Sequence, residues 1–243
     1  MPQESSSANY NWPYTVRSDT VFGPQYQGRF LINRDTPIRG GVYYGDYGGE
    51  AIVVAPESYP EEYEKWYDLA KSDASSMGVV REDRLLRSVF TTVAEQMPYS
   101  SKGVLNVLET AARSNGISEF EEGRKIELSA FMKLHVGECR HQALAQGALL
   151  EMFKDGNYIG GMTRVHRNLK TTPQKIRDDE GHAWVRHTKD INEPMILDVA
   201  GQYFGSLQDS VEDSGWNYFQ PGEKQRRAAS NIGPIVIGKD GRY

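Results

Sequence analysis

The sequence contains a single cysteine, Cys139, among its 243 residues. An intramolecular disulfide is therefore excluded, which suits a reducing compartment. Long apolar runs are also lacking, and one of the longest, 51–55, is far shorter than a membrane-spanning helix requires. The polar residues 1–7 contain no apolar signal segment. These absences together predict a cytoplasmic protein without a transmembrane segment.

An excess of basic residues is absent as well. The chain has 28 Lys and Arg against 33 Asp and Glu, for a net charge of −5. This balance argues against non-specific binding to nucleic acid or to an anionic membrane surface. With 38% hydrophobic and 25% charged residues, the composition is that of a globular protein. The length fits one large domain, or a core with an extension.

The pattern of turns and apolar residues divides the chain into three parts. The first is an N-terminal extension of short β-like runs and one helix, whose role the sequence does not indicate. The second is a core with two amphipathic helices followed by a third helix and several strands. The last is a C-terminal segment that we expect to pack on the core. The predicted parts are 1–78, 79–205 and 206–243, and the predicted helices before the cysteine span 60–74, 81–97 and 102–113.

The stretch 137–153, which contains Cys139, has the pattern of a buried helix. Apolar side chains recur from Leu144 to Phe153 at helical spacing, and small residues fill much of the remaining surface. Gly137 is expected to give the chain a flexible start, which leaves Cys139 in the first turn. Unpaired backbone N–H groups and the helix dipole there can lower a thiol pKa to roughly 3.5–7.5. Cys139 is therefore a candidate nucleophile.

A predicted hairpin supplies a candidate base for this thiol. The two strand-like segments, 181–187 and 194–200, surround a turn-like stretch centred on Asp190. If the hairpin folds about Asp190, His182 pairs directly with Asp198, and their Cβ atoms lie about 4.5–5.5 Å apart. A carboxylate beside an imidazole orients one ring nitrogen and stabilises the protonated ring, which leaves the other nitrogen for the thiol.

Three motifs in this order resemble the core of the transglutaminase-like cysteine enzymes, which are circularly rearranged relatives of the papain fold. The Cys-Arg-His sequence is similar to their peptidase-like branch. The resemblance covers roughly residues 80–205, about half of the chain. It implies an α+β fold in which the cysteine-bearing helix packs on an antiparallel sheet, preceded here by an N-terminal β-rich extension. The motifs are 137–144, 181–185 and 196–199, and the upstream segment 94–99 also resembles the one that precedes the nucleophile there.

The resemblance implies that Cys139 is the nucleophile, His182 the general base and acid, and Asp198 the orienting carboxylate. The expected reaction is acyl transfer on an amide bond, in a peptide or a glutamine side chain, through a thioester at Cys139. If water attacks the thioester, the enzyme is a peptidase or a glutamine deamidase, whereas attack by a primary amine makes it a transglutaminase. The expected partner is a peptide or protein substrate, with neither nucleic acid nor membrane involved. The sequence does not choose among these reactions and predicts no oligomeric state.

Three further residues are candidates for supporting roles. The Cys139 backbone N–H is expected to bind the oxyanion together with one more donor, for which Gln96 and Tyr99 are the candidates. Trp184 alternates onto the His182 side of its strand, so it is a candidate wall of the pocket. Packing in the core explains the position of Trp184 equally well.

Two alternatives remain open at this point. One is a binding or scaffold module that has kept a transglutaminase-like fold without turnover, since fold does not determine function. The other is a zinc site made by Cys139, His141, His182 and Asp198. The spacing opposes zinc, because residues 139 and 141 do not share a helical face. We therefore expect neither a metal nor a cofactor.

Overall fold

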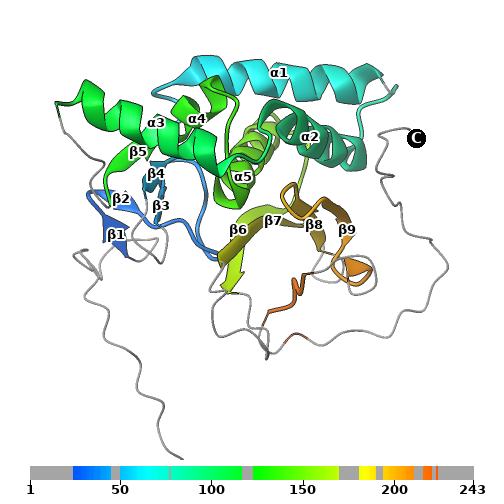
Figure 1. Ribbon diagram of the computed structural model, residues 1–243. Helices are drawn as coiled ribbons and strands as arrows, with labels where there is room; N and C mark the ends of the chain where they lie inside the picture. The colour runs from blue at the N-terminus through cyan, green and yellow to red at the C-terminus, as the bar shows by residue number, and fades with distance from the viewer. Residues whose placement is uncertain are drawn as a thin grey trace, which may run out of the picture.

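The structure of this protein is a computed structural model (Figure 1). The part of the chain that it describes is a mixed α/β structure with several sheets. The helices lie together above the four-stranded sheet in Figure 1, and the smaller sheets lie to one side. The described residues are 24–44, 50–76, 78–116, 123–169, 181–189, 194–210, 216–220 and 223.

The three helices predicted upstream of the cysteine are confirmed, with ends that differ by two residues at most. The second ends at Gln96 because Met97 precedes Pro98, and a residue before proline is displaced from helical geometry. The third is capped by Ser100, whose side chain accepts a hydrogen bond from the Gly103 N–H. A short helix before Gly137 was not predicted. The helices are α1 (Pro60–Ser76), α2 (Glu82–Gln96), α3 (Ser101–Ser114), α4 (Leu128–Lys133) and α5 (Cys139–Asp155).

The strands form three sheets. The largest is antiparallel throughout and has the order β6-β7-β8-β9. In the second, β4 pairs antiparallel with β3 and parallel with β5. The third is the pair β1 and β2. The strands are β1 (Gln25–Tyr26), β2 (Arg29–Phe30), β3 (Val42–Tyr44), β4 (Ala51–Val53), β5 (Lys125–Glu127), β6 (Met162–Leu169), β7 (Gly181–Thr188), β8 (Met195–Asp198) and β9 (Tyr203–Ser206).

The predicted register of the β7–β8 hairpin is wrong by two residues. Val185 pairs with Leu197 and Arg186 with Ile196, which places Asp198 opposite Trp184 rather than His182. A shift of two residues keeps every side chain on its own face, so the alternation of apolar residues cannot reveal it. His182 and Asp198 are therefore diagonal neighbours on one face of the sheet. Asp190, the predicted centre of the turn, lies outside the described residues.

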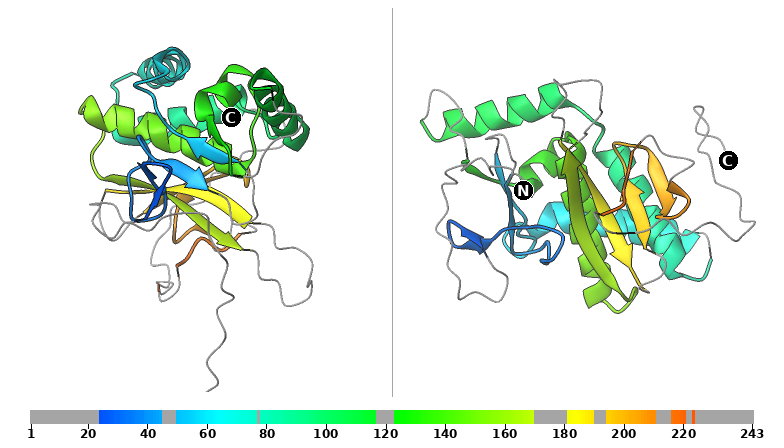
Figure 2. Two further views of the ribbon diagram at one scale, coloured as in Figure 1. Left: turned by 90° about the vertical axis from the view of Figure 1, so that its left-hand side faces the viewer. Right: turned by 90° about the horizontal axis from the view of Figure 1, so that it is seen from below.

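The four-stranded sheet is covered on both faces. Val165, Val185 and Leu197 belong to the cluster of buried residues that also contains α5, whose residues 141–150 are all buried. On the other face Trp184 and Ile196 pack with Tyr203 and Tyr218 in a second cluster. The view from below in Figure 2 shows this second face in front of the helices. A sheet buried on both faces positions residues at its strand ends rigidly.

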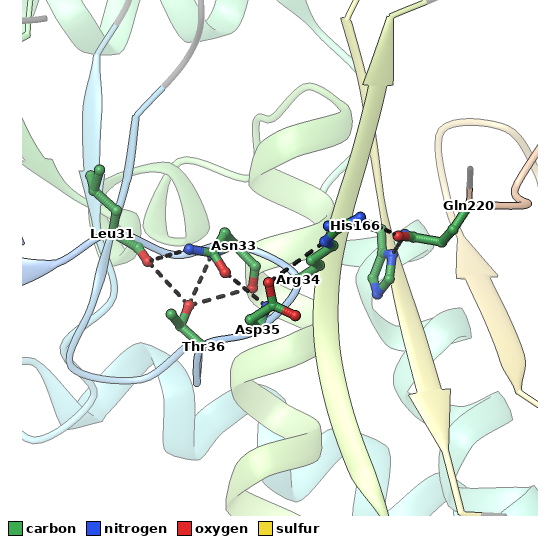
Figure 3. A network of polar contacts seen from close by, with 7 residues as sticks. All are labelled: Leu31, Asn33, Arg34, Asp35, Thr36, His166 and Gln220. Atoms are coloured by element: carbon green, nitrogen blue, oxygen red, sulfur yellow. Dashed lines mark hydrogen bonds and ion pairs between the residues drawn. The ribbon is translucent and has the colours of Figure 1, made fainter. Parts of the chain in front are cut away.

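The C-terminal segment 216–220 is tied to both the sheet and the N-terminal part of the chain. The side chain of Gln220 donates a hydrogen bond to His166 Nδ1 on β6 and accepts one from Arg34 at 2.6 Å (Figure 3). Burial, together with the charge of Arg186, lowers the pKa of His166 to about 4. Its ring is therefore neutral and able to accept this bond. The boundaries of the three predicted parts of the chain stay predictions.

None of the described helices is long and apolar enough to cross a membrane. The strand predicted at 158–165 begins later, at Met162, because the chain bends at Gly161 just before it. Gly161 has a φ of 75°, and an added Cβ there would lie 2.6 Å from the carbonyl oxygen of Thr188. Only glycine fits that position without strain. Strand β9 was not predicted.

Packing of the N-terminal part against α5 leads to a prediction for stability. A Cβ at Gly147, in the middle of α5, would lie 2.2 Å from Ile38 Cδ1. We expect Gly147→Ala to lower the free energy of unfolding by about 1–3 kcal/mol, because overpacking outweighs the better helix propensity of alanine. Urea unfolding followed by circular dichroism measures this change.

Ile38→Val removes the Cδ1 atom itself, so the double variant Gly147→Ala/Ile38→Val should be more stable than Gly147→Ala alone. Gly160→Ala is the matched control, since no atom lies within 4 Å of the added Cβ. If Gly147→Ala is as stable as the wild type, Ile38 does not pack on α5 as described.

Candidate active site

Cys139 is the first residue of α5, and close packing positions it there. An added Cβ at Gly137 would lie 2.4 Å from Met97 Sδ, so this glycine serves close approach rather than the flexibility that the sequence suggested. The segment before α3 is held alongside, since the Ser100 N–H donates to the Gly137 carbonyl at 2.8 Å. The Gln142 side chain donates to the Met97 carbonyl, also at 2.8 Å. The end of α2 and the start of α5 are thus joined.

The structure brings Cys139, His182 and Asp198 together in that order. His182 Nε2 lies 2.5 Å from Asp198 Oδ2, and the Cys139 thiol is near enough to the His182 ring to raise its pKa. Because Nε2 is bound to Asp198, Nδ1 is the ring nitrogen left for the thiol. Cys139 Sγ also lies 3.9 Å from the carbonyl oxygen of Gly181, the first residue of β7. The start of α5 therefore meets the start of β7.

The surroundings of His182 favour its charged form. Burial would lower its pKa, but the hydrogen bond to Asp198 and the nearby Asp198 and Cys139 side chains raise the pKa of His182 to about 9. At neutral pH the ring is therefore an imidazolium. Such a ring stabilises a neighbouring thiolate and can give its proton to another group.

Three donors surround the Asp198 carboxylate, which is only 1% exposed. His182 and the Tyr218 hydroxyl both donate to Oδ2, the latter at 2.7 Å, and the Gly201 N–H donates to Oδ1 at 2.8 Å. Tyr218 and its neighbour Trp216 had no assigned role in the sequence. The Trp216 ring lies edge-on to the His182 ring, with 4.6 Å between centroids. Only their aromatic character could have pointed to them, and aromatic residues are common in any core.

A buried charged network flanks the nucleophile on the other side. Arg140 Nε donates to Glu50 Oε1 at 2.8 Å, and Arg140 also pairs with Glu138. Glu50 is 2% exposed, and His141 Nε2 lies 3.0 Å from the same oxygen. Burial would raise the pKa of Glu50, but His141 and Arg140 lower it to about 2. This network connects the N-terminal part of the chain to the first turn of α5.

His141 therefore has a structural partner. Its Nδ1 accepts the Glu138 N–H at 3.2 Å, and burial lowers the pKa of His141, so the ring is neutral with Nε2 toward Glu50. Both ring nitrogens of His141 thus face groups other than the thiol, whereas a zinc site would need one of them beside Cys139. Among the described residues, no three His, Cys, Asp or Glu side chains gather where they could hold a metal ion.

The supporting candidates differ in where they lie. Tyr99 forms a β-bridge with Gly137, and burial, followed by the charges of Glu138 and Cys139, raises the pKa of Tyr99. Its side chain is near the nucleophile and 58% exposed. Gln96 ends α2, and its carbonyl accepts a hydrogen bond from His135. Trp184 is buried in the cluster beneath the sheet and contacts the His182 ring at 5.9 Å between centroids.

Comparison with known proteins adds little to this geometry. No family model matches the chain, and no curated protein matches it. A solved structure described as "Crystal structure of a TGase" is similar, with a TM-score of 0.39 and 14% sequence identity. The likeness covers 74% of this chain and 37% of that one. A likeness this low establishes neither a fold family nor an activity.

The raised pKa of His182 predicts a loss of stability at alkaline pH. The folded state favours the protonated ring, so the stabilisation is complete below the unfolded pKa of 6.5 and is lost as the pH rises through about 9. Asp198→Asn removes the charge that holds this proton. Over this pH range, the free energy of unfolding should therefore fall less in the variant than in the wild type, by on the order of 1–3 kcal/mol.

Urea unfolding at a series of pH values measures the difference. Asp68→Asn is the matched control, because Asp68 is exposed on α1, on the far side of the helices from the sheet. It should keep the wild-type pH dependence. An Asp198→Asn protein with that same dependence would contradict the pairing of His182 with Asp198.

Proposed function

We propose that this protein is a cysteine-nucleophile enzyme that transfers the acyl group of an amide bond. The observation that supports this proposal best is the grouping of Cys139, His182 and Asp198 at the first residue of a buried helix. His182 is hydrogen-bonded to Asp198, and Cys139 lies against the first residue of the strand that carries His182. A thiol, an imidazolium and a buried carboxylate in this order form the constellation that nucleophilic catalysis by cysteine requires. The roles are nucleophile for Cys139, general acid and base for His182, and orienting carboxylate for Asp198.

In the proposed reaction the Cys139 thiolate attacks the carbonyl carbon of the amide and forms a C–S bond. The oxyanion is bound by the Cys139 backbone N–H, which has no partner within the helix. A second donor is needed, and Tyr99 is the better of the two candidates because it lies beside Gly137. His182 then donates its proton to the leaving nitrogen, the C–N bond breaks and a thioester remains.

The second half of the reaction regenerates the thiol. His182, now neutral, removes a proton from water or from a primary amine, which attacks the thioester carbonyl. The C–S bond breaks, and the Cys139 thiolate and the imidazolium are restored. Water yields hydrolysis of a peptide or deamidation of glutamine, and an amine yields a new amide. No metal or cofactor takes part in these steps.

We infer from the three sequence motifs that the described core is transglutaminase-like, with α5 and the antiparallel sheet as its papain-like centre. The substrate is then a peptide or protein, presented in the reducing cytoplasm where a free thiol persists. The N-terminal part supplies Glu50, which pairs with Arg140 next to the nucleophile. We propose that this part supports the site.

Replacement of the nucleophile tests the proposal directly. Cys139→Ala should abolish turnover and leave the thermal unfolding temperature nearly unchanged, since alanine suits the start of a helix. The assay incubates the protein with peptide and glutamine substrates, with and without a primary amine. Mass spectrometry then distinguishes cleavage, deamidation and amine incorporation. Turnover by Cys139→Ala above a trace would contradict the assignment, and Asp68→Asn should be as active as the wild type.

Reactivity of the thiol separates an enzyme from a scaffold that has kept the fold. A thiolate held by His182 should react with a low concentration of iodoacetamide at about pH 6 much faster than a free thiol, which is almost fully protonated there. Asp198→Asn should slow this reaction, because the imidazolium loses the charge that stabilises it. Reaction at the rate of an ordinary thiol would favour the binding-module alternative.

A further inference from the structure

Tyr218, in the C-terminal segment, contacts the Asp198–His182 pair directly. Its hydroxyl donates to Asp198 Oδ2 at 2.7 Å, the same oxygen that lies 2.5 Å from His182 Nε2. Tyr218 is 1% exposed, as is Asp198, so water has little access to either group. A single carboxylate oxygen in a dry site thus serves two donors.

Packing fixes the direction of this hydroxyl. The Tyr218 ring stacks on Tyr203 with 5.4 Å between centroids and meets Trp184 edge-on at 5.2 Å. Two residues later, Gln220 is bound to His166 and to Arg34 (Figure 3). A buried phenol that packs against two aromatic rings, in a segment anchored two residues later, has little freedom to swing away.

We propose that Tyr218 is a positioning residue that sets both the orientation of Asp198 and the strength of its hydrogen bond to His182. The role in turnover rests on the proposed function. Oδ2 divides its negative charge between the phenol and the imidazolium, so each hydrogen bond weakens the other. Tyr218 therefore limits how tightly His182 holds its proton. An imidazolium that held the proton more tightly would protonate the leaving nitrogen less readily.

Tyr218→Phe removes the hydroxyl and keeps the ring in its packed place. With one donor gone, Oδ2 interacts more strongly with the imidazolium, and the pKa of His182 rises further. The carboxylate is also freer to rotate. We expect kcat to fall about 10- to 100-fold, the effect of losing one hydrogen bond to a charged group. KM should stay unchanged, because a buried side chain cannot touch the substrate.

Tyr203→Phe is the matched control. The Tyr203 hydroxyl donates to the Ser206 carbonyl at 2.6 Å, and its ring belongs to the same cluster as Tyr218. This variant loses a hydroxyl of the same cluster that is bound to Ser206, whereas Tyr218→Phe loses the hydroxyl that is bound to Asp198. Any purely structural consequence of removing a buried phenol should therefore be common to both variants.

The experiment has two arms that use the full-length protein. NMR titration of the His182 imidazole gives its pKa in the wild type and both variants, without any substrate. Steady-state kinetics over a pH range give kcat, KM and the alkaline limb, which reports the same group. Circular dichroism establishes that each variant is folded.

The proposal expects the His182 pKa to rise in Tyr218→Phe and to keep its wild-type value in Tyr203→Phe, with the kcat loss confined to the former. Superimposable titration curves for the two variants would overturn it, even if turnover were lost. If the wild type shows no turnover on any acyl donor, the proposed function fails. The titration arm still decides whether Tyr218 controls the Asp198–His182 pair.

Discussion

The Asp198 carboxylate must be satisfied in a place that water does not reach, and much of the fold follows from this requirement. A buried carboxylate is tolerated only when donors surround it. Here the donors are His182 on β7, Gly201 in the turn after β8, and Tyr218 in the C-terminal segment. Gly201 can approach so closely because it has no Cβ; a Cβ at this position would lie only 2.5 Å from Asp198 Oδ2. Three separate stretches of chain are thus held at one point.

The nucleophile depends on a second buried set of charges. Glu50 and Arg140 neutralise each other beside the first turn of α5, and the neutral His141 completes the set. Removing one partner of such a pair leaves an unpaired buried charge, which is far costlier than the pair is stabilising. Cys139 therefore lies between two electrostatic arrangements, one of which orients His182 while the other holds the start of its own helix. Neither arrangement belongs to a single part of the chain.

Several features of this structure could be predicted from short stretches of sequence. Met97-Pro98 ends α2, and the repeating apolar residues after Leu144 mark α5 as a buried helix. The hairpin shows where such prediction stops. Alternation of apolar residues placed His182 and Asp198 on the same face, but a slip of two residues leaves that alternation intact. The true register is decided by packing against α5 and by the second cluster, which contains Tyr218.

By itself the sequence determined that one thiol is available, that it begins a buried helix, and that His182 and Asp198 lie on strands that can form a hairpin. These are local properties, because spacing and side-chain chemistry determine them within a few residues. Only the tertiary structure decided which ring nitrogen of His182 binds Asp198, and that Glu50 and Tyr218 flank the two ends of the site. Glu50 is 90 residues from Arg140, and Tyr218 is 20 residues from Asp198. Contacts between residues so far apart depend on how whole elements pack, which no local pattern records.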